Sequence, residues 1–219
     1  MKRSDESIKQ VNCTPITAFG PVVLKVEIAS EMIDKLNAVC DIAINEEKKS
    51  WAKKLVGQLK NEWLVDNELL VKQDLYGYLC GVAQLYAGYV NTGLRQVDLR
   101  HFQEPGTCNI QSAWVNEMKK YEYNPAHYHT NCALSSVLYL EVPDFNSNPI
   151  LKNPPENKRN VDGCLEFLYG SYWPGIGDNG NHVVDPKAGD FYIFPSHLQH
   201  IVYPFGCEGI RRSMAINFF

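Results

Sequence analysis

Residues 190–219 read DFYIFPSHLQHIVYPFGCEGIRRSMAINFF and contain three short apolar runs separated by Pro and Gly. The runs at 190–194, 200–205 and 213–219 are rich in Val, Ile, Tyr and Phe, the residue types that favour strands. Breaks of this kind between runs of this length are typical of strands joined by turns. The stretch therefore predicts consecutive strands of a β-sandwich or barrel.

Upstream of this stretch, the second half of the chain keeps the same pattern. Further strands are expected at 110–118, 135–142 and 164–168. The polar stretch at 143–162 is long for a connection inside a compact domain, which is typical of a lid or a binding loop. Residues 175–181 form a second turn-rich stretch.

The first half is patterned as helices. Ser30 is expected as the N-cap of a first helix, and residues 74–90 form the clearest amphipathic stretch. A short helix is also expected across 55–63, because Leu55, Leu59 and Trp63 recur at steps of four. We expect these helices to pack against one sheet, which gives a mainly β fold with flanking helices (α+β). The expected organisation is a single domain over 1–219, with helical support at 1–95 and the strand-rich core at 96–219.

The composition disfavours several classes of partner. With 21 basic and 25 acidic side chains, the formal net charge is −4, which argues against general nucleic-acid binding. The longest apolar segment, 77–90, is interrupted by Gln84 and is too short to span a bilayer, so no membrane partner is expected.

The cysteines and the N-terminal segment indicate the compartment. Seven cysteines are an odd number, they are widely spaced, and they include no CxxC pair, which favours reduced thiols. The segment MKRSDESIKQVN has no apolar stretch behind its basic residues, so it is not patterned as a secretory signal. A cytoplasmic location is expected.

The histidines suggest a metal site. His127 and His129 form an HxH pair within Asn124-Pro-Ala-His-Tyr-His-Thr-Asn131. In an extended segment, residues two apart project from the same face, so both imidazoles can bind one metal ion. His200, at the start of a later strand, is the candidate third ligand. Such a facial set leaves coordination positions open, and imidazole suits iron, zinc, copper or nickel.

The other histidines carry weaker expectations. His197 lies three residues before His200 and competes with it for the third place. His101 and His182 have no partner at a useful spacing and are expected on the surface or in loops. The alternative to a metal site is that a histidine of the HxH pair only caps a turn or hydrogen-bonds in the core.

Arg211 and Arg212 open the last expected strand. Consecutive strand residues face opposite sides, so only one of the two can face the interior of a barrel. A buried guanidinium needs an anionic partner, and its fork matches a carboxylate. The inward arginine is a candidate anchor for an organic acid. The alternative is that both arginines lie on the surface, which is the commoner position of an Arg-Arg pair.

Together these motifs resemble the Fe(II)- and 2-oxoglutarate-dependent oxygenases, and within them a branch common in marine phages and bacteria with an HxH motif and a prolyl-hydroxylase-like architecture. The matching segments are His127-Tyr-His129, Ser135-Ser-Val137-Leu-Tyr139, Phe194-Pro-Ser-His-Leu-Gln-His200-Ile-Val202 and Arg211-Arg-Ser213 with Asn217, preceded by Trp114-Val115-Asn116. The resemblance covers about residues 110–219, and the first half contributes only a compatible helical layout.

The resemblance implies a double-stranded β-helix (jelly-roll) with the N-terminal helices packed on one sheet, and a site that uses Fe(II), 2-oxoglutarate and O2. It gives His127 and His200 the two histidine ligand places, and the full expected catalytic set is His127, His129, His200 and Arg211, with the three histidines as metal ligands. The cofactor-binding residues it implies are Arg211, Tyr139, Ser213 and Asn217. Arg211 aligns with the arginine that pairs with the distal carboxylate of 2-oxoglutarate, and Tyr139 would add a hydroxyl to that carboxylate.

One departure from the resemblance concerns the ligand set. The broader superfamily has a carboxylate where this sequence has His129, and a neutral imidazole there leaves the site one unit more positive. His129 is the favoured third ligand. The alternatives are a carboxylate from Glu166 or Asp190, or Asn131 from the His129-Thr-Asn131 segment. A second departure, Ser136 where the branch usually has glycine, is expected to be minor.

The activity implied is oxidative decarboxylation of 2-oxoglutarate to succinate and CO2, coupled to hydroxylation of a small molecule or of a peptide or protein. A prolyl residue is the most natural substrate. Two alternatives stay open, a cupin-like three-histidine metalloenzyme in which Arg211 holds the substrate itself, and a non-catalytic β-roll binding module. The expected location is the cytoplasm, or the host cell cytoplasm if the protein is phage-encoded, and the oligomeric state is left open.

Overall fold

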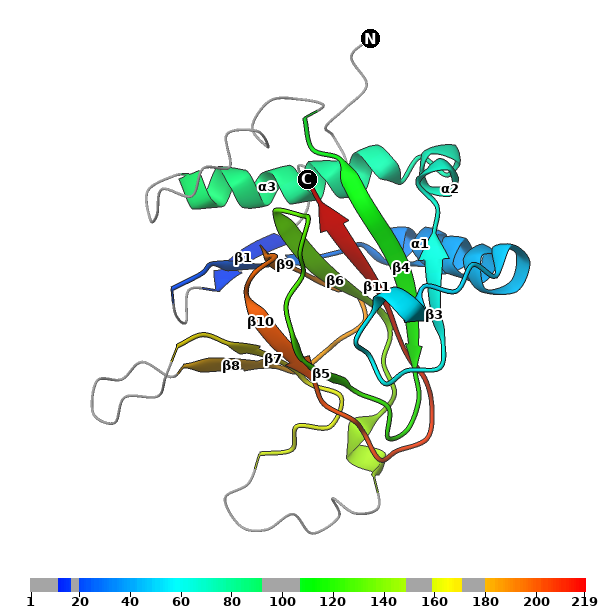
Figure 1. The fold of residues 1–219 in the computed structure, drawn as a ribbon, viewed down its shortest axis with the longest axis vertical. Coiled ribbons are helices and arrows are strands. Elements are labelled where there is room, and N and C mark those ends of the chain that lie inside the picture. The colour runs from blue at the N-terminus through cyan, green and yellow to red at the C-terminus, as the bar shows by residue number, and fades with distance from the viewer. Residues whose placement is uncertain (1–11, 17–19, 92–106, 149–158, 171–179) are drawn as a thin grey trace.

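The computed structural model describes residues 12–16, 20–91, 107–148, 159–170 and 180–219. Within these ranges two antiparallel sheets face one another, with strand orders β1-β2-β9-β6-β11-β4-β3 and β5-β10-β7-β8 (Figure 1). The strands are β1 (Asn12–Ile16), β2 (Val23–Glu27), β3 (Glu62–Val65), β4 (Ile110–Met118), β5 (Asn124–His127), β6 (Leu134–Glu141), β7 (Leu165–Leu168), β8 (Asn181–Val184), β9 (Asp190–Pro195), β10 (Gln199–Val202) and β11 (Arg211–Phe218). This arrangement confirms the expected jelly-roll with helices on one sheet.

The helices cover the outer face of the larger sheet (Figure 1). They are α1 (Ser30–Ile42), α2 (Asn67–Lys72) and α3 (Tyr76–Asn91). The apolar stripe of α3 buries Leu79, Val82 and Tyr86 against the sheet, and one such leucine stabilises the fold by about 2 kcal/mol. The Tyr86 hydroxyl donates to the Val22 carbonyl at 3.0 Å, which ties α3 to the chain entering β2. The helix expected at 74–90 is therefore present.

Strand β11 shows how the sequence separates the two cores. Met214 and Ile216 point outward and pack under the helices. The alternate residues Arg211, Ser213 and Ala215 line a pocket between the two sheets. Because side chains alternate along a strand, one strand supplies both the helix-covered core and the interior of the roll. The polar residues Arg211 and Ser213 therefore lie on the interior face, whereas Arg212 lies on the outer face.

The prediction of a short helix across residues 55–63 is wrong. Its last residues belong to β3, which pairs with β4 so that Leu64 lies opposite Trp114. Residues 55–61 contain no helix, and the 3-10 turn at Ala52–Lys54 ends before them. Pairing with β4 overrides the local spacing of apolar residues, because propensity is a weak preference beside tertiary contacts. Strands β1 and β2 also lie in the half that was patterned as helical.

The expected strands of the second half are present as β4, β6, β7, β9, β10 and β11. Strand β10 ends at Val202 instead of continuing to residue 205, and β5 and β8 were not expected. Helix α1 begins at Ser30 with Ala29 as its N-cap, one residue before the expected cap. The expected loops at 143–162 and 175–181 fall largely on residues 149–158 and 171–179, which lie outside the described ranges.

Two further observations bear on the expected compartment and partners. In the described part of the chain, no helix combines the length and the apolar character needed to cross a membrane. All seven cysteines lie in the described ranges, and none of them is in a disulfide bond.

Candidate metal centre

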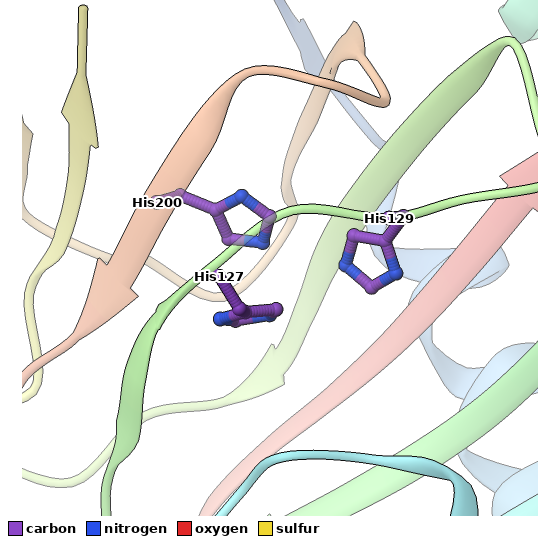
Figure 2. Close-up of side chains that lie close together, drawn as sticks. All are labelled: His127, His129 and His200. Atoms are coloured by element: carbon purple, nitrogen blue, oxygen red, sulfur yellow. The ribbon is translucent and has the colours of Figure 1, made fainter.

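The three candidate ligands meet between the two sheets. Strand β5 ends at His127 and pairs with β10, where His200 lies directly opposite His127. His129 follows two residues later, and its backbone amide donates to the Ser196 carbonyl at 2.8 Å. Figure 2 shows the three rings turned toward one another. The HxH segment and the later strand are thus brought together by strand pairing.

The geometry of the cluster suits a single metal ion. One ring nitrogen from each of His127, His129 and His200 lies within 4.8 Å of the other two. The ring centroids are 4.2 Å apart for His127 and His200, and 5.2 and 5.3 Å apart for the pairs that include His129. Three imidazoles on one side of a metal leave the opposite positions open for other ligands.

Backbone carbonyls fix the tautomer of two histidines. His127 Nδ1 lies 2.7 Å from the Pro125 carbonyl oxygen, and His200 Nδ1 lies 2.9 Å from the Leu198 carbonyl oxygen. A carbonyl oxygen only accepts, so each Nδ1 carries the proton and donates. The lone pair is then on Nε2, the atom left free for a metal. Histidine ligands of metals are usually held in this way through the second ring nitrogen.

His129 is held by a different set of contacts. Its Nδ1 lies 3.5 Å from Asn217 Nδ2, and its ring centroid lies 5.7 Å from that of Trp114. Asn217 is itself fixed because its Oδ1 accepts from the Ser135 hydroxyl at 2.9 Å. The orientation of His129 is therefore set from β6 and β11, on the sheet opposite β5 and β10.

The electrostatics keep the imidazoles neutral. Burial lowers the pKa of His127, and burial together with the His127 charge lowers the pKa of His129 to about 4. Burial and the two neighbouring histidines lower the pKa of His200 well below its usual value. Neutral imidazole is the form that binds metals, so the free site is ready for an ion at neutral pH.

The alternative ligands lie elsewhere. Glu166 accepts hydrogen bonds from Asn181 and Tyr203 on the smaller sheet. Asp190 pairs with Lys25 at 2.9 Å and accepts from the Tyr192 hydroxyl. Among the described residues, neither carboxylate joins the histidine cluster.

Of the remaining candidates, none belongs to the cluster within the described ranges. Asn131 is exposed and has a left-handed backbone with φ of 61°. His197 is exposed, which removes it as a competitor of His200. His182 is half-buried on β8, contrary to the expected surface or loop position, because β8 pairs with β7. His101 lies outside the described residues.

The two arginines face opposite sides of the larger sheet. Arg211 is 2% exposed, and its Nη2 donates to the Tyr139 hydroxyl at 3.0 Å. Its Nε has no acceptor, and no ion pair holds it within the ranges that the structure describes. Arg212 faces outward and pairs with Glu117 at 2.7 Å and with Asp41 at 2.9 Å. Arg211 is therefore the inward arginine and shares the pocket of the histidines.

The donors present fit iron and an organic acid. Three neutral imidazoles suit Fe(II) among the first-row metals. A buried guanidinium without an acid is costly unless an anion joins it. Burial raises the pKa of Tyr139, so its hydroxyl keeps its proton while it accepts from Arg211. That proton is available for a carboxylate oxygen.

Sequence reasoning missed three polar residues of the same pocket. Glu62, Asn116 and Asn124 line it beside the histidines. The resemblance includes Trp114-Val115-Asn116 but gives Asn116 no role, and the apolar spacing across 55–63 predicts a helix at residue 62. The available signal was a polar side chain inside an apolar strand, as in Glu62-Trp-Leu-Val65, which marks a buried position with a specific partner.

Comparison with known proteins gives a family and a fold. Residues 112–217 match the family model described as "Putative 2OG-Fe(II) oxygenase". A comparison with curated protein sequences gives no match. A Pseudomonas putida prolyl-4-hydroxylase is similar in structure, with a TM-score of 0.51 and 16% identity over 97% of this chain and 95% of its own.

Two further solved structures show the same likeness. AviO1 from Streptomyces viridochromogenes Tue57 has a TM-score of 0.51 and 17% identity over 97% of this chain and 91% of its own. A Trichoplax adhaerens prolyl hydroxylase, solved with a hypoxia inducible factor peptide fragment, has a TM-score of 0.50 and 14% identity over 97% and 86%. At these identities the likeness shows the fold, while the family match spans all three histidines and Arg211. The match to the 2OG-Fe(II) oxygenases, oxidoreductases that use Fe(II), 2-oxoglutarate and O2, therefore covers residues 112–217, just under half of the chain.

Proposed function

We propose that the chain is an Fe(II)- and 2-oxoglutarate-dependent hydroxylase whose iron is held by His127, His129 and His200. One observation carries the proposal. A single pocket contains three converging imidazoles and a buried guanidinium that has no carboxylate partner among the described residues. When bound, iron and 2-oxoglutarate supply O2-dependent hydroxylation of a C–H bond, with 2-oxoglutarate converted to succinate and CO2.

Arg211 and Tyr139 are suited to hold the distal carboxylate of 2-oxoglutarate. Arg211 contributes the positive charge and an Nε–H that has no acceptor. Tyr139 accepts from Arg211 and keeps its own proton for a ligand oxygen. Charge-assisted hydrogen bonds of this kind are about twice as strong as neutral ones. Ser213 and Asn217 remain proposed members of this set, since Ser213 lines the pocket and Asn217 contacts His129.

The charge of the pocket favours a dianionic cosubstrate. Because the three histidines are neutral, they leave the double positive charge of the metal uncompensated. Arg211 adds a further positive charge in the same buried space. Opposite charges attract strongly where water is excluded, so an acid with two carboxylates is the ligand best matched to this pocket.

We further propose that the hydroxylated group is a prolyl residue of a peptide or protein. The support is by analogy, since two of the structures with the same fold are prolyl hydroxylases and one of them was solved with a peptide. The substrate is tested by offering proline-containing peptides and measuring mass gain of one oxygen atom.

The cosubstrate is tested by measuring succinate. Succinate should form only when Fe(II), 2-oxoglutarate and O2 are all present, and its rate should fall sharply in an Arg211→Ala variant. A wild-type protein that binds iron but shows no affinity for 2-oxoglutarate would sink the proposal. Oxygen consumption without 2-oxoglutarate would favour the cupin-like alternative, and absence of both metal binding and turnover would favour a binding module.

A further inference from the structure

The pocket of the histidines has a second polar side, formed by β3, β4 and β5. Glu62 lies directly opposite Asn116 in the β3–β4 pair, so both side chains project from the same face of the sheet. Asn124 begins β5, three residues before His127. All three residues line the pocket together with the histidines and Arg211.

Three oxygen atoms on this side have no donor in the described part of the chain. Glu62 Oε2, Asn116 Oδ1 and Asn124 Oδ1 are buried, and none has a hydrogen-bond partner among the described residues. Glu62 is only 2% exposed. Leaving a buried acceptor unsatisfied costs about 1–3 kcal/mol, and more when the group is charged. Three such acceptors in one pocket indicate a ligand that brings several donors.

Gly57 lies beside Asn124 Oδ1 and beside the other carboxylate oxygen of Glu62, Oε1. A Cβ built on Gly57 would overlap Asn124 Oδ1 and lie 2.7 Å from Glu62 Oε1. The two side chains therefore converge on the backbone of Gly57, in a space that any other residue would fill. Glycine permits such a close approach because it has no Cβ.

We infer that Glu62, Asn116 and Asn124 form a subsite for a positively charged substrate group, an ammonium or a guanidinium, beside the position where hydroxylation occurs. The inference rests on the proposed function, because it names the substrate class of that same pocket. An ammonium carries three N–H donors and no acceptor, which matches three acceptors that lack donors. Glu62 also lacks an ion-pair partner among the described residues, so a cation would supply its missing counter-charge.

The pocket contains two side chains that call for ligands of opposite charge. Arg211 calls for an anion, and Glu62 calls for a cation. Burial, with a smaller effect from Glu122, raises the pKa of Glu62 to about 7, as expected for a carboxylate without a partner. A bound ammonium would stabilise the ionised form. On the prolyl proposal, the cation is a basic side chain or a free amino group close to the prolyl residue.

The test measures binding of n-butylammonium to the full chain at about pH 8, without added metal or 2-oxoglutarate. 1-Butanol is the neutral probe of the same length. We expect wild-type protein to bind n-butylammonium at least tenfold more tightly than 1-butanol, and Glu62→Gln to abolish this preference. Glu141→Gln is the matched control, because Glu141 is exposed on β6 and should keep it.

A second variant guards against misfolding of the first. Gly57→Ala leaves every charge in place but fills the space beside Glu62 and Asn124, so it should weaken n-butylammonium binding while circular dichroism stays native. Equal affinity for the two probes, or unchanged ammonium binding in Glu62→Gln, would overturn the inference. Since this assay contains no iron or 2-oxoglutarate, its failure is distinct from a failure of succinate formation.

A peptide pair identifies the source of the cation. Acetyl-Gly-Pro-Lys-amide is compared with the analogue that carries norleucine in place of lysine. A Glu62-dependent preference for the lysine peptide would assign the cation to a peptide substrate. A preference confined to n-butylammonium would assign it to a small amine. If neither the lysine peptide nor n-butylammonium is preferred over its neutral analogue, the inference is contradicted.

Discussion

Replacing Arg211 by methionine should strongly weaken 2-oxoglutarate binding without destabilising the empty protein. Arg211 is 2% exposed and unpaired with any described carboxylate, so its charge is costly to bury. Its loss should stabilise the empty fold by about 1–2 kcal/mol, after about 1 kcal/mol is subtracted for the hydrogen bond to Tyr139. Two charge-assisted hydrogen bonds to a carboxylate contribute about 3–4 kcal/mol together, which corresponds to a loss of affinity of roughly 100- to 1,000-fold.

The neighbouring arginine provides the matched control. Arg212 faces outward, and its Nη2 lies 2.7 Å from a Glu117 oxygen while its Nη1 lies 2.9 Å from Asp41. Arg212→Met leaves the Glu117 carboxylate, whose side chain is 12% exposed, without its cation. That change should cost about 1–3 kcal/mol of stability and leave 2-oxoglutarate affinity unchanged.

Two measurements separate the variants. Urea denaturation gives the free energy of unfolding, and anaerobic calorimetry of the Fe(II)-loaded protein gives the affinity for 2-oxoglutarate. Arg211→Met should gain stability and lose affinity for 2-oxoglutarate, whereas Arg212→Met should lose stability and keep that affinity. If Arg211→Met binds 2-oxoglutarate within threefold of wild type, or if both variants lose stability equally, the reasoning about the inward guanidinium is refuted.

Three other outcomes are expected. His200→Ala should lose bound iron, measured by elemental analysis after gel filtration, whereas the exposed His197→Ala should retain it; equal iron content in both would remove His200 as a ligand. Folding lowers the pKa of His129 to about 4, so the unfolded chain takes up the proton first, and metal-free protein should lose up to about 3 kcal/mol as pH falls from about 6.5 to 4. Urea midpoints that stay constant across that window would contradict this. Because folding raises the pKa of Glu62 to about 7, the folded state holds the Glu62 proton, and the free energy of unfolding should fall as pH rises from about 4.5 to 7. Glu62→Gln should remove this loss and be about 2–3 kcal/mol more stable than wild type at pH 8. Urea midpoints of Glu62→Gln no higher than those of wild type would count against this.

The strand-rich half was predictable because its signals are local. The apolar runs that form β9 and β11 are bounded by Pro and Gly, so each segment indicates its own structure. The alternation along β11 also indicated that only one of Arg211 and Arg212 could face inward. Which of the two does so depends on the register with β4 and β6, which no local pattern specifies.

The missed features depend on distant partners. Strand β3 exists because it pairs with β4, and its own residues were equally compatible with a helical spacing. The polar side of the pocket was missed for the same reason, since Glu62 and Asn116 become neighbours only through that pair. The convergence of His127 and His200 was expected from the HxH pair and the later strand, while its physical basis, the pairing of β5 with β10, is a property of the folded chain.

The most direct test of the account is an anaerobic titration of the full chain with Fe(II) and then with 2-oxoglutarate, followed by visible absorption. Chelation of iron by 2-oxoglutarate produces a weak charge-transfer band. We predict that this band appears in wild-type protein, saturates near one equivalent, and is absent from Arg211→Met at the same concentrations. Iron that binds to the histidine cluster without any band on addition of 2-oxoglutarate would contradict it.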